Sequence, residues 1–223
     1  MPARRPLRLV LVSVLIGLWL ALLGPVPASA AVGYSRDVYF AGAYEHQIDS
    51  RTCTAASTAM MMNMLDRQDL NLPQMSILRF SQVRDALMDA VQRGSDPLGW
   101  SRAASYFSRY TARPTVYQWE AYPSKTAALK RAAAQIAATG KPVGLVIKHG
   151  THAVVMTGIR TGTNPLKGRD FSLVSIAVSD PLGYAHRWYT ASSYPLDSYR
   201  ELDATAKYDR AWYGKFVIIV PQG

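Results

Sequence analysis

The chain contains one cysteine, Cys53, among its 223 residues. A thiol attacks a carbonyl carbon only as the thiolate, and a helix N-terminus and a nearby imidazolium are two common means of lowering its pKa. Small and apolar residues recur at helical spacing over residues 52–66. Cys53 is therefore predicted to lie in the first turn of a buried helix, with Asp49 or Ser50 as its cap.

An unpaired thiol in an exported protein has three interpretations: an intermolecular disulfide, a buried inert thiol, or a nucleophile. Composition alone slightly favours the buried thiol, because free cysteine is among the most buried residue types. The neighbouring residues shift the balance towards a nucleophile. The methionines at 60, 61, 62 and 64 follow helical spacing, and they are interpreted as core rather than as a ligand surface.

A base for Cys53 has to come from one of the four histidines in the chain. His152 is the best candidate, since it stands at the head of the apolar run 153–156 and a rigid strand would hold its ring. His149, three residues earlier, falls in the preceding turn and is less well held. His46 and His186 lie among polar residues and are expected at the surface.

A base of this kind works best when its second ring nitrogen is oriented by a carboxylate or an amide. Asp180 is the candidate, because it ends an apolar strand and precedes Pro181; the alternative is an ordinary turn residue. Gln47, six residues before Cys53, carries an amide that would stabilise an oxyanion beside the backbone N–H of the nucleophile.

The remaining patterns predict an α+β domain with helices in its first half and antiparallel strands in its last third. A short extended piece is expected at 38–40 and a strand at 115–119. Ile77, Phe80, Val83, Leu87 and Val91 mark one face of a helix at 75–92. Further helices are predicted at 100–110 and 125–138, and strands at 143–148, 153–159, 172–178, 187–190 and 216–220.

Residues 1–30 read as a secretory signal peptide rather than as part of the domain. Three arginines precede an apolar run at 9–23, and the small residues Ala28-Ser29-Ala30 follow. The alternative is an uncleaved anchor, but the run is shorter than the roughly 20 residues that a spanning helix needs. We therefore expect residues 31–223 to be a single secreted, extracellular domain that has no membrane span, with attachment to the cell surface left open.

The net charge of +10 includes the three signal arginines, which leaves about +7 on residues 31–223. These charges form no basic block interleaved with aromatic residues, so the sequence argues against nucleic-acid binding. A solvated basic surface is the simplest interpretation, and attraction to an anionic wall, a lipid or an acidic substrate is the alternative.

Three segments carry a resemblance to a known family. The segment QIDSRTC at 47–53, continued by small residues, is similar to the nucleophile region of papain-like cysteine peptidases, most closely of peptidase family C39. GTHAVVMTG at 150–158 resembles the histidine strand of that family, and SDP at 179–181 resembles its acidic segment. The resemblance covers roughly residues 44–183.

The resemblance implies a papain-like α+β fold in which a nucleophile helix packs on a C-terminal antiparallel sheet. It implies Cys53 as nucleophile, His152 as general base and acid, Asp180 as orienting group and Gln47 in the oxyanion hole. Thr54 departs from the glycine that often follows the nucleophile in this family. The transporter and ATP-binding domains of its leader-cleaving members are missing here, so that substrate does not carry over.

The expected function is hydrolysis of a peptide or related amide bond by a monomeric enzyme that needs no cofactor or metal. Two alternatives stay open: a catalytically silent module that binds a peptide or a wall polymer, and an acyl transferase related to transglutaminases or amidases. The three differ in the reactivity of Cys53 and in whether added amines are consumed.

Overall fold

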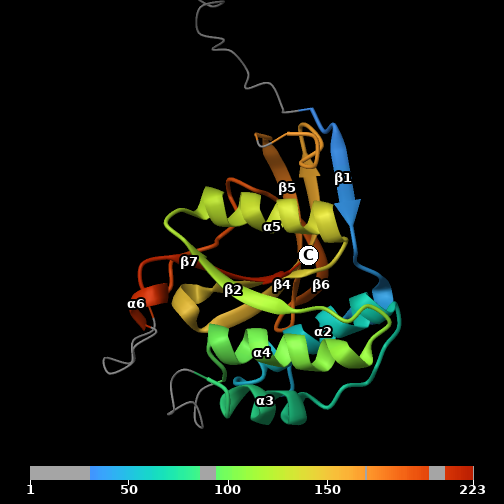
Figure 1. The fold of residues 1–223 in the computed structure, drawn as a ribbon, viewed down its shortest axis with the longest axis vertical. Coiled ribbons are helices and arrows are strands. Elements are labelled where there is room, and N and C mark those ends of the chain that lie inside the picture. The colour runs from blue at the N-terminus through green and yellow to red at the C-terminus, as the bar shows by residue number, and fades with distance from the viewer. Residues whose placement is uncertain (1–30, 86–93, 169, 201–208, 223) are drawn as a thin grey trace, which may run out of the picture. The chain divides into compact units, whose positions relative to one another are not determined.

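The computed structural model describes residues 31–85, 94–168, 170–200 and 209–222 (Figure 1). Residues 31–223 form one compact unit. The predicted signal peptide at 1–30 lies outside the described residues and stays a prediction. Within the described ranges, no helix combines the length and the apolarity that a bilayer crossing requires.

An antiparallel sheet forms the centre of the described part. Its strands pair in the order β2-β7-β3-β4-β5-β6, and β1 also pairs with β4. The strand bounds are β1 Tyr34–Asp37, β2 Tyr117–Tyr122, β3 Val143–Ile147, β4 His152–Thr161, β5 Leu173–Asp180, β6 Tyr184–Thr190 and β7 Phe216–Pro221.

Strand β4 is the central element of this sheet. β3 pairs with its first half and β1 with its second half, while β5 pairs along the other side. Every residue of β4 is buried except Arg160. A strand buried on both faces reads as a continuous apolar run, and this explains why 153–156 stood out in the sequence. His152 therefore begins a strand that its neighbours hold from both sides.

Helices cover both faces of the sheet (Figure 1). α5 lies on one face, and α2 and α4 lie on the other, with α3 packed outside them. The helix bounds are α2 Cys53–Asp66, α3 Gln74–Gln82, α4 Pro97–Phe107, α5 Lys125–Thr139 and α6 Asp209–Trp212; short 3-10 turns are η1 Ala41–Ala43, η3 Ser108–Tyr110 and η4 Lys148–Gly150.

Two close contacts set the distance between the helices and the sheet. The Ser57 hydroxyl of α2 donates to the Ala153 carbonyl of β4 over 3.1 Å. Trp100 of α4 is fully buried and lies over Gly144 of β3, where an added Cβ would come within 2.5 Å of the indole ring. The nucleophile helix is thus held directly against the histidine strand.

The structure corrects several predicted boundaries. α3 ends at Gln82 rather than near residue 92, and Val83 is 76% exposed instead of facing the core. Leu87 and Val91 of that predicted helix lie outside the described residues. The first strand occupies Tyr34–Asp37 instead of 38–40, and it joins the sheet at β4. Helices therefore do not simply precede strands along the chain.

Candidate active site

Cys53 is the first residue of α2, as the sequence predicted. No acidic residue stands in the first turn of the helix to offset its positive end. The N-cap residue is Thr52, and its side chain makes no bond to the helix. Neither Asp49 nor Ser50 is the cap, so that prediction was wrong.

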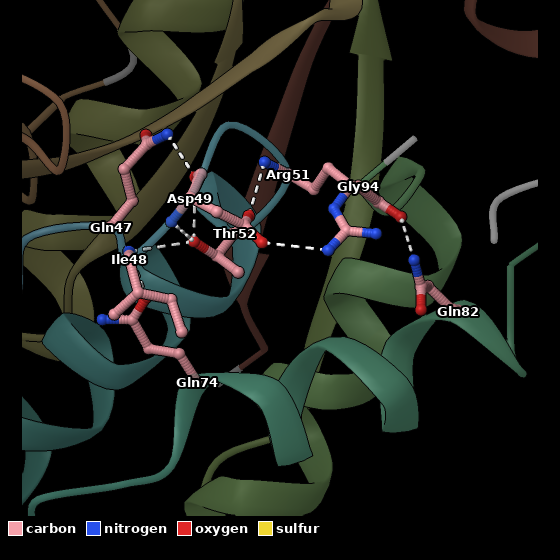
Figure 2. A network of polar contacts seen from close by, with 8 residues as sticks. All are labelled: Gln47, Ile48, Asp49, Arg51, Thr52, Gln74, Gln82 and Gly94. Carbon is pink, nitrogen blue, oxygen red and sulfur yellow. Dashed lines mark hydrogen bonds and ion pairs between the residues drawn. The ribbon is translucent and has the colours of Figure 1, made fainter. Parts of the chain in front are cut away.

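The Thr52 hydroxyl serves the loop before the helix instead of the helix itself. Its oxygen accepts from the backbone N–H groups of Ile48 and Asp49, each over 3.1 Å (Figure 2). The Asp49 carboxylate accepts from the backbone N–H of Arg51 and pairs with the Arg51 guanidinium at 3.0 Å. The tight turn is therefore stabilised without a side chain that covers the helix N-terminus.

His152 and Asp180 meet across the β4 and β5 strands. Val155 pairs with Ser179, and continuing this register brings Asp180 level with Val154, two residues from His152 and on the same face. The His152 Nε2 lies 2.8 Å from the Asp180 Oδ1. The His152 ring is 6% exposed, so this contact is largely shielded from water.

The Cys53 side chain, which is itself 6% exposed, is close enough to His152 to raise the pKa of its ring. Because Nε2 faces Asp180, the remaining ring nitrogen, Nδ1, is the one available to the thiol. Burial lowers the pKa of His152, but the hydrogen bond with Asp180 and the interaction with Cys53 outweigh burial and raise the pKa to about 9. The histidine is therefore protonated at neutral pH and can donate a proton to a leaving group.

Backbone groups hold the Asp180 carboxylate in place. Burial raises the pKa of Asp180, but hydrogen bonds from His152 and from the Leu182 N–H outweigh it and bring the pKa below its usual value. The Leu182 N–H donates to Oδ1 over 2.9 Å. The Tyr44 hydroxyl donates to the Asp180 carbonyl over 3.2 Å. Asp180 is thus a charged partner for His152 in a rigid setting.

Gln47 lies beside this pair, but its amide is used within its own loop. Its backbone N–H donates to the Pro181 carbonyl over 2.9 Å, next to Asp180. Its side-chain Nε2 donates to the Asp49 carbonyl over 2.7 Å (Figure 2). Among the described residues, no hydrogen bond joins Gln47 to Cys53. One of the two amide hydrogens is engaged, and the predicted oxyanion role depends on the other.

The other histidines occupy different settings. His149 has a left-handed backbone, is 53% exposed, and lies 3.7 Å from the Asp197 carboxylate. His186 is half-buried rather than at the surface, with its Nε2 3.0 Å from the Asp37 carboxylate. His46 is exposed, as predicted, and its Nδ1 lies 2.7 Å from the Gln47 carbonyl. Of the four, His152 is the one joined to Cys53.

Several residues around the site were not anticipated from the sequence. No sequence motif marks the Tyr44 hydroxyl or the Leu182 N–H. Both contact Asp180 only in the folded chain. Ile48 and Leu182 are large apolar side chains that are 61% and 50% exposed. The bond from Gln47 to Pro181 brings their two segments together beside the site. We expect these two side chains to form an apolar rim that a substrate side chain would meet.

In the described ranges, no group of three His, Cys, Asp or Glu side chains is arranged to hold a metal ion. The chemistry that the site can perform from its own residues is nucleophilic attack by a thiolate. The imidazolium of His152 and the oriented carboxylate of Asp180 accompany the Cys53 sulfur.

Comparison with known proteins is informative at the level of fold. No protein-family model matches the sequence, and no curated protein matches it. Among solved structures, UfSP from C. elegans matches with a TM-score of 0.50 and 16% identity over 89% of this chain and 36% of that one. A double-glycine-motif protease from an AMS/PCAT transporter, solved with its leader peptide, matches with a TM-score of 0.41 and 16% identity. It covers 88% of this chain and 96% of the protease.

The likeness to UfSP concerns the fold, since the identity is low. This likeness in fold agrees with the predicted packing of a helix, α2, against an antiparallel sheet. The chain therefore has the papain-like α+β fold of the cysteine proteases.

Proposed function

We propose that this protein is a secreted thiol hydrolase that cleaves a peptide or a related amide bond through a thioester on Cys53. One observation carries the proposal: a cysteine at a helix N-terminus raises the pKa of a buried histidine, and that histidine lies 2.8 Å from an aspartate. A nucleophile, a base and an orienting group in this relation are the diagnostic arrangement of covalent acyl transfer.

At the start of the proposed reaction, the proton of the Cys53 thiol has moved to the His152 ring. The Cys53 thiolate adds to the carbonyl carbon and forms the carbon–sulfur bond, while the carbonyl oxygen takes the negative charge. The imidazolium of His152 then protonates the leaving nitrogen as the carbon–nitrogen bond breaks. Neutral His152 next removes a proton from water, which attacks the thioester and releases the acid and the thiol.

The first N–H groups of α2 are the natural donors to the oxyanion. They lie beside Cys53, and the Thr52 side chain does not cap them. Donors placed in advance around a developing charge commonly supply the largest part of the stabilisation of a transition state. The second hydrogen of the Gln47 amide would complete this group of donors, as the sequence predicted.

One observation favours the alternative of a silent binding module. The Gln47 amide donates to the Asp49 carbonyl, so at least part of its capacity is spent on the loop. Replacing Gln47 with Ala separates the two roles. If Gln47 serves the oxyanion, kcat falls by about 100-fold while the alkylation rate of Cys53 stays unchanged. If Gln47 only holds the loop, alkylation of Cys53 slows together with turnover.

Alkylation by iodoacetamide tests the proposal directly. An activated Cys53 reacts near neutral pH much faster than a model thiol, and His152→Ala removes the acceleration. Hydrolysis of a peptide library, read by mass spectrometry, shows whether bonds are cut, and the Cys53→Ala variant supplies the control. A fast-alkylating protein that consumes added amines without hydrolysis would instead be an acyl transferase. Slow alkylation without cleavage would overturn the proposal.

Secretion is the second part of the proposal and has its own test. It is supported by the arginines, apolar run and small-residue site within residues 1–30. The full chain expressed in an exporting host should accumulate outside the cytoplasm, and N-terminal mass spectrometry should find Ala31 first. A product that keeps Met1 and sediments with membranes would indicate an anchor instead.

A further inference from the structure

A pocket outside the active site lies where the C-terminal end of α3 meets the outer side of α4. Its volume is about 400 Å³. The lining residues are all described, and Cys53, His152 and Asp180 are not among them; the lining consists of Phe80, Arg84, Arg102, Ser105, Tyr106 and Arg109. A polar and aromatic cavity that the proposed catalysis does not use needs an explanation of its own.

Helical spacing builds one wall of this pocket. Arg102, Tyr106 and Arg109 stand at positions i, i+4 and i+7 of the continuous α4 and η3 segment, so they share one face. The Arg109 guanidinium lies 5.8 Å from the Tyr106 ring centre. The face therefore presents an aromatic ring between two cations.

The other wall comes from α3 and the turn after it. The Phe80 ring stacks on Tyr106 with their centres 4.2 Å apart and their planes 26° from parallel. The Arg84 guanidinium lies 3.5 Å from the Phe80 ring centre and donates to the Phe80 carbonyl over 3.0 Å. Arg102 donates to the Arg84 carbonyl over 2.9 Å. These contacts hold the Phe80 ring between Tyr106 and the Arg84 guanidinium, so this wall of the pocket is ordered.

Three cations at one pocket repel each other, and carboxylates within the described ranges do not neutralise them. None of Arg84, Arg102 and Arg109 forms an ion pair there, whereas Arg131 holds Glu120 with two hydrogen bonds of 2.9 and 2.8 Å. Each guanidinium has five N–H donors, and the bonds to backbone carbonyls engage few of them. The pocket is therefore complementary to an anion.

The nearest carboxyl in sequence, Asp85, does not serve these arginines. Its Oδ1 accepts from the Ser95 hydroxyl over 2.7 Å and from the Asp96 N–H over 3.1 Å. Burial and the neighbouring Asp96 carboxylate raise the pKa of Asp85 to about 9, so it carries little charge at neutral pH. Asp85 therefore does not cancel the positive charge of the pocket.

We infer that this pocket binds an acidic peptide segment, with its carboxylates on the arginines and an apolar side chain against the edges of the Phe80 and Tyr106 rings. Guanidinium groups bind carboxylates with two parallel hydrogen bonds, and arginine and tyrosine are enriched where peptides and proteins are recognised. The aromatic part of the lining favours a peptide over a bare phosphate, since a phosphate would make no apolar contact with it. The inference does not depend on catalysis at Cys53.

Fluorescence anisotropy of a labelled peptide tests this inference. The probe is a seven-residue peptide that carries four glutamates around a central phenylalanine, added to the full chain in a Cys53→Ala background that prevents cleavage. We expect saturable binding that weakens with added salt, and Arg109→Glu should weaken it at least about tenfold. Replacing the phenylalanine of the probe with alanine should weaken binding several-fold.

Arg79→Glu is the matched control, because Arg79 is exposed on α3, lies outside the pocket and undergoes the same change of charge. It should change the affinity less than twofold. Circular dichroism and the melting temperature should be the same for both variants, because Arg109 is exposed at the surface. Equal losses in the two variants would indicate a generally basic surface and would overturn the inference.

Two further arms separate the peptide from other anions. Inorganic phosphate and phosphatidylglycerol vesicles are added as competitors and as direct ligands. Phosphate that displaces the peptide at equal concentration, or vesicle binding that Arg109→Glu abolishes, would reassign the pocket to phosphate groups. Absence of binding by the glutamate peptide would also reject the inference.

Discussion

His149 and His152 are three residues apart and each lies beside an aspartate, but the two histidine–aspartate pairs differ in almost every physical respect. His152 begins a central strand, is buried, and lies 2.8 Å from Asp180. His149 lies in the preceding turn with a left-handed backbone, is mostly exposed, and lies 3.7 Å from Asp197. The residue types are the same, so the surroundings alone distinguish a candidate catalytic base from a surface ion pair.

The two pairs differ in their exposure to solvent as well as in their geometry. An exposed pair loses most of its electrostatic interaction to water and salt, whereas a buried pair keeps it. The pKa of His152 rises to about 9 even though burial by itself would lower it. A lone histidine with a nearby aspartate in the sequence is therefore weak support for catalysis until its strand and its burial are known.

The largest effect should come from removing the buried histidine. His152→Asn should lower kcat/KM for peptide hydrolysis by about 10⁴-fold or more, because the residue both activates the thiol and protonates the leaving nitrogen. His149→Asn is the matched change, and asparagine tolerates its left-handed backbone. It should leave kcat/KM within about twofold of the parent. Comparable losses of kcat/KM in the two variants would show that burial does not distinguish the roles of the two histidines.

The aspartates should differ in the same direction. Asp180→Asn should lower kcat by about 10² to 10⁴-fold, since the carboxylate stabilises the imidazolium and fixes the ring. Asp197→Asn should have little effect on turnover. Steady-state kinetics with matched melting curves provide the measurement. An unchanged kcat in Asp180→Asn would reduce Asp180 to a turn residue, which was the alternative interpretation of its sequence.

The pH profile sharpens the comparison further. His152 must be protonated to release the amine, so kcat/KM should fall as the pH rises through about 9. Asp180→Asn removes a group that raises this pKa, and the falling limb should therefore move to lower pH. Asp197→Asn should leave the limb in place. If the falling limb stays near pH 9 in Asp180→Asn, Asp180 does not raise the pKa of His152.

The shifted pKa values of His152 and Asp180 also predict that the stability of the fold depends on pH. The raised pKa of His152 contributes stability that is complete below its unfolded value and is lost as the pH rises through about 9. The lowered pKa of Asp180 contributes stability that is lost as the pH falls through its folded value. Chemical denaturation across pH should therefore show a smaller free energy of unfolding on the alkaline side. The loss should disappear in His152→Asn.

The smallest effect should come from the apolar rim. Ile48→Ser and Leu182→Ser remove exposed side chains beside the site, so folding should be unaffected. Each should raise KM about three- to tenfold for substrates with a bulky apolar side chain next to the scissile bond, and less for glycine-rich substrates. Equal changes for both substrate types would mean that the rim does not contact the substrate.

Sequence patterns predicted most of the elements that position the site. The small-residue helix after Cys53 and the apolar run after His152 are continuous signals, because both elements are buried along nearly their whole length. The short strand β1 was misplaced by a few residues, since four alternating residues carry little periodic information. The end of α3 was also misjudged, because Val83 continues the apolar pattern although the helix has already ended.

The sequence by itself determined which residues have the chemistry: one thiol, one histidine at the head of a buried strand and one aspartate at the end of an apolar strand. Only the tertiary structure decided which groups meet. The register of β4 with β5 brings Asp180 to His152, and the loop before α2 takes up the Gln47 amide. The arginine pocket also escapes the sequence, because the packing of α3 against α4 creates it. Local patterns report burial along one element, whereas contacts between distant segments depend on how those elements pack.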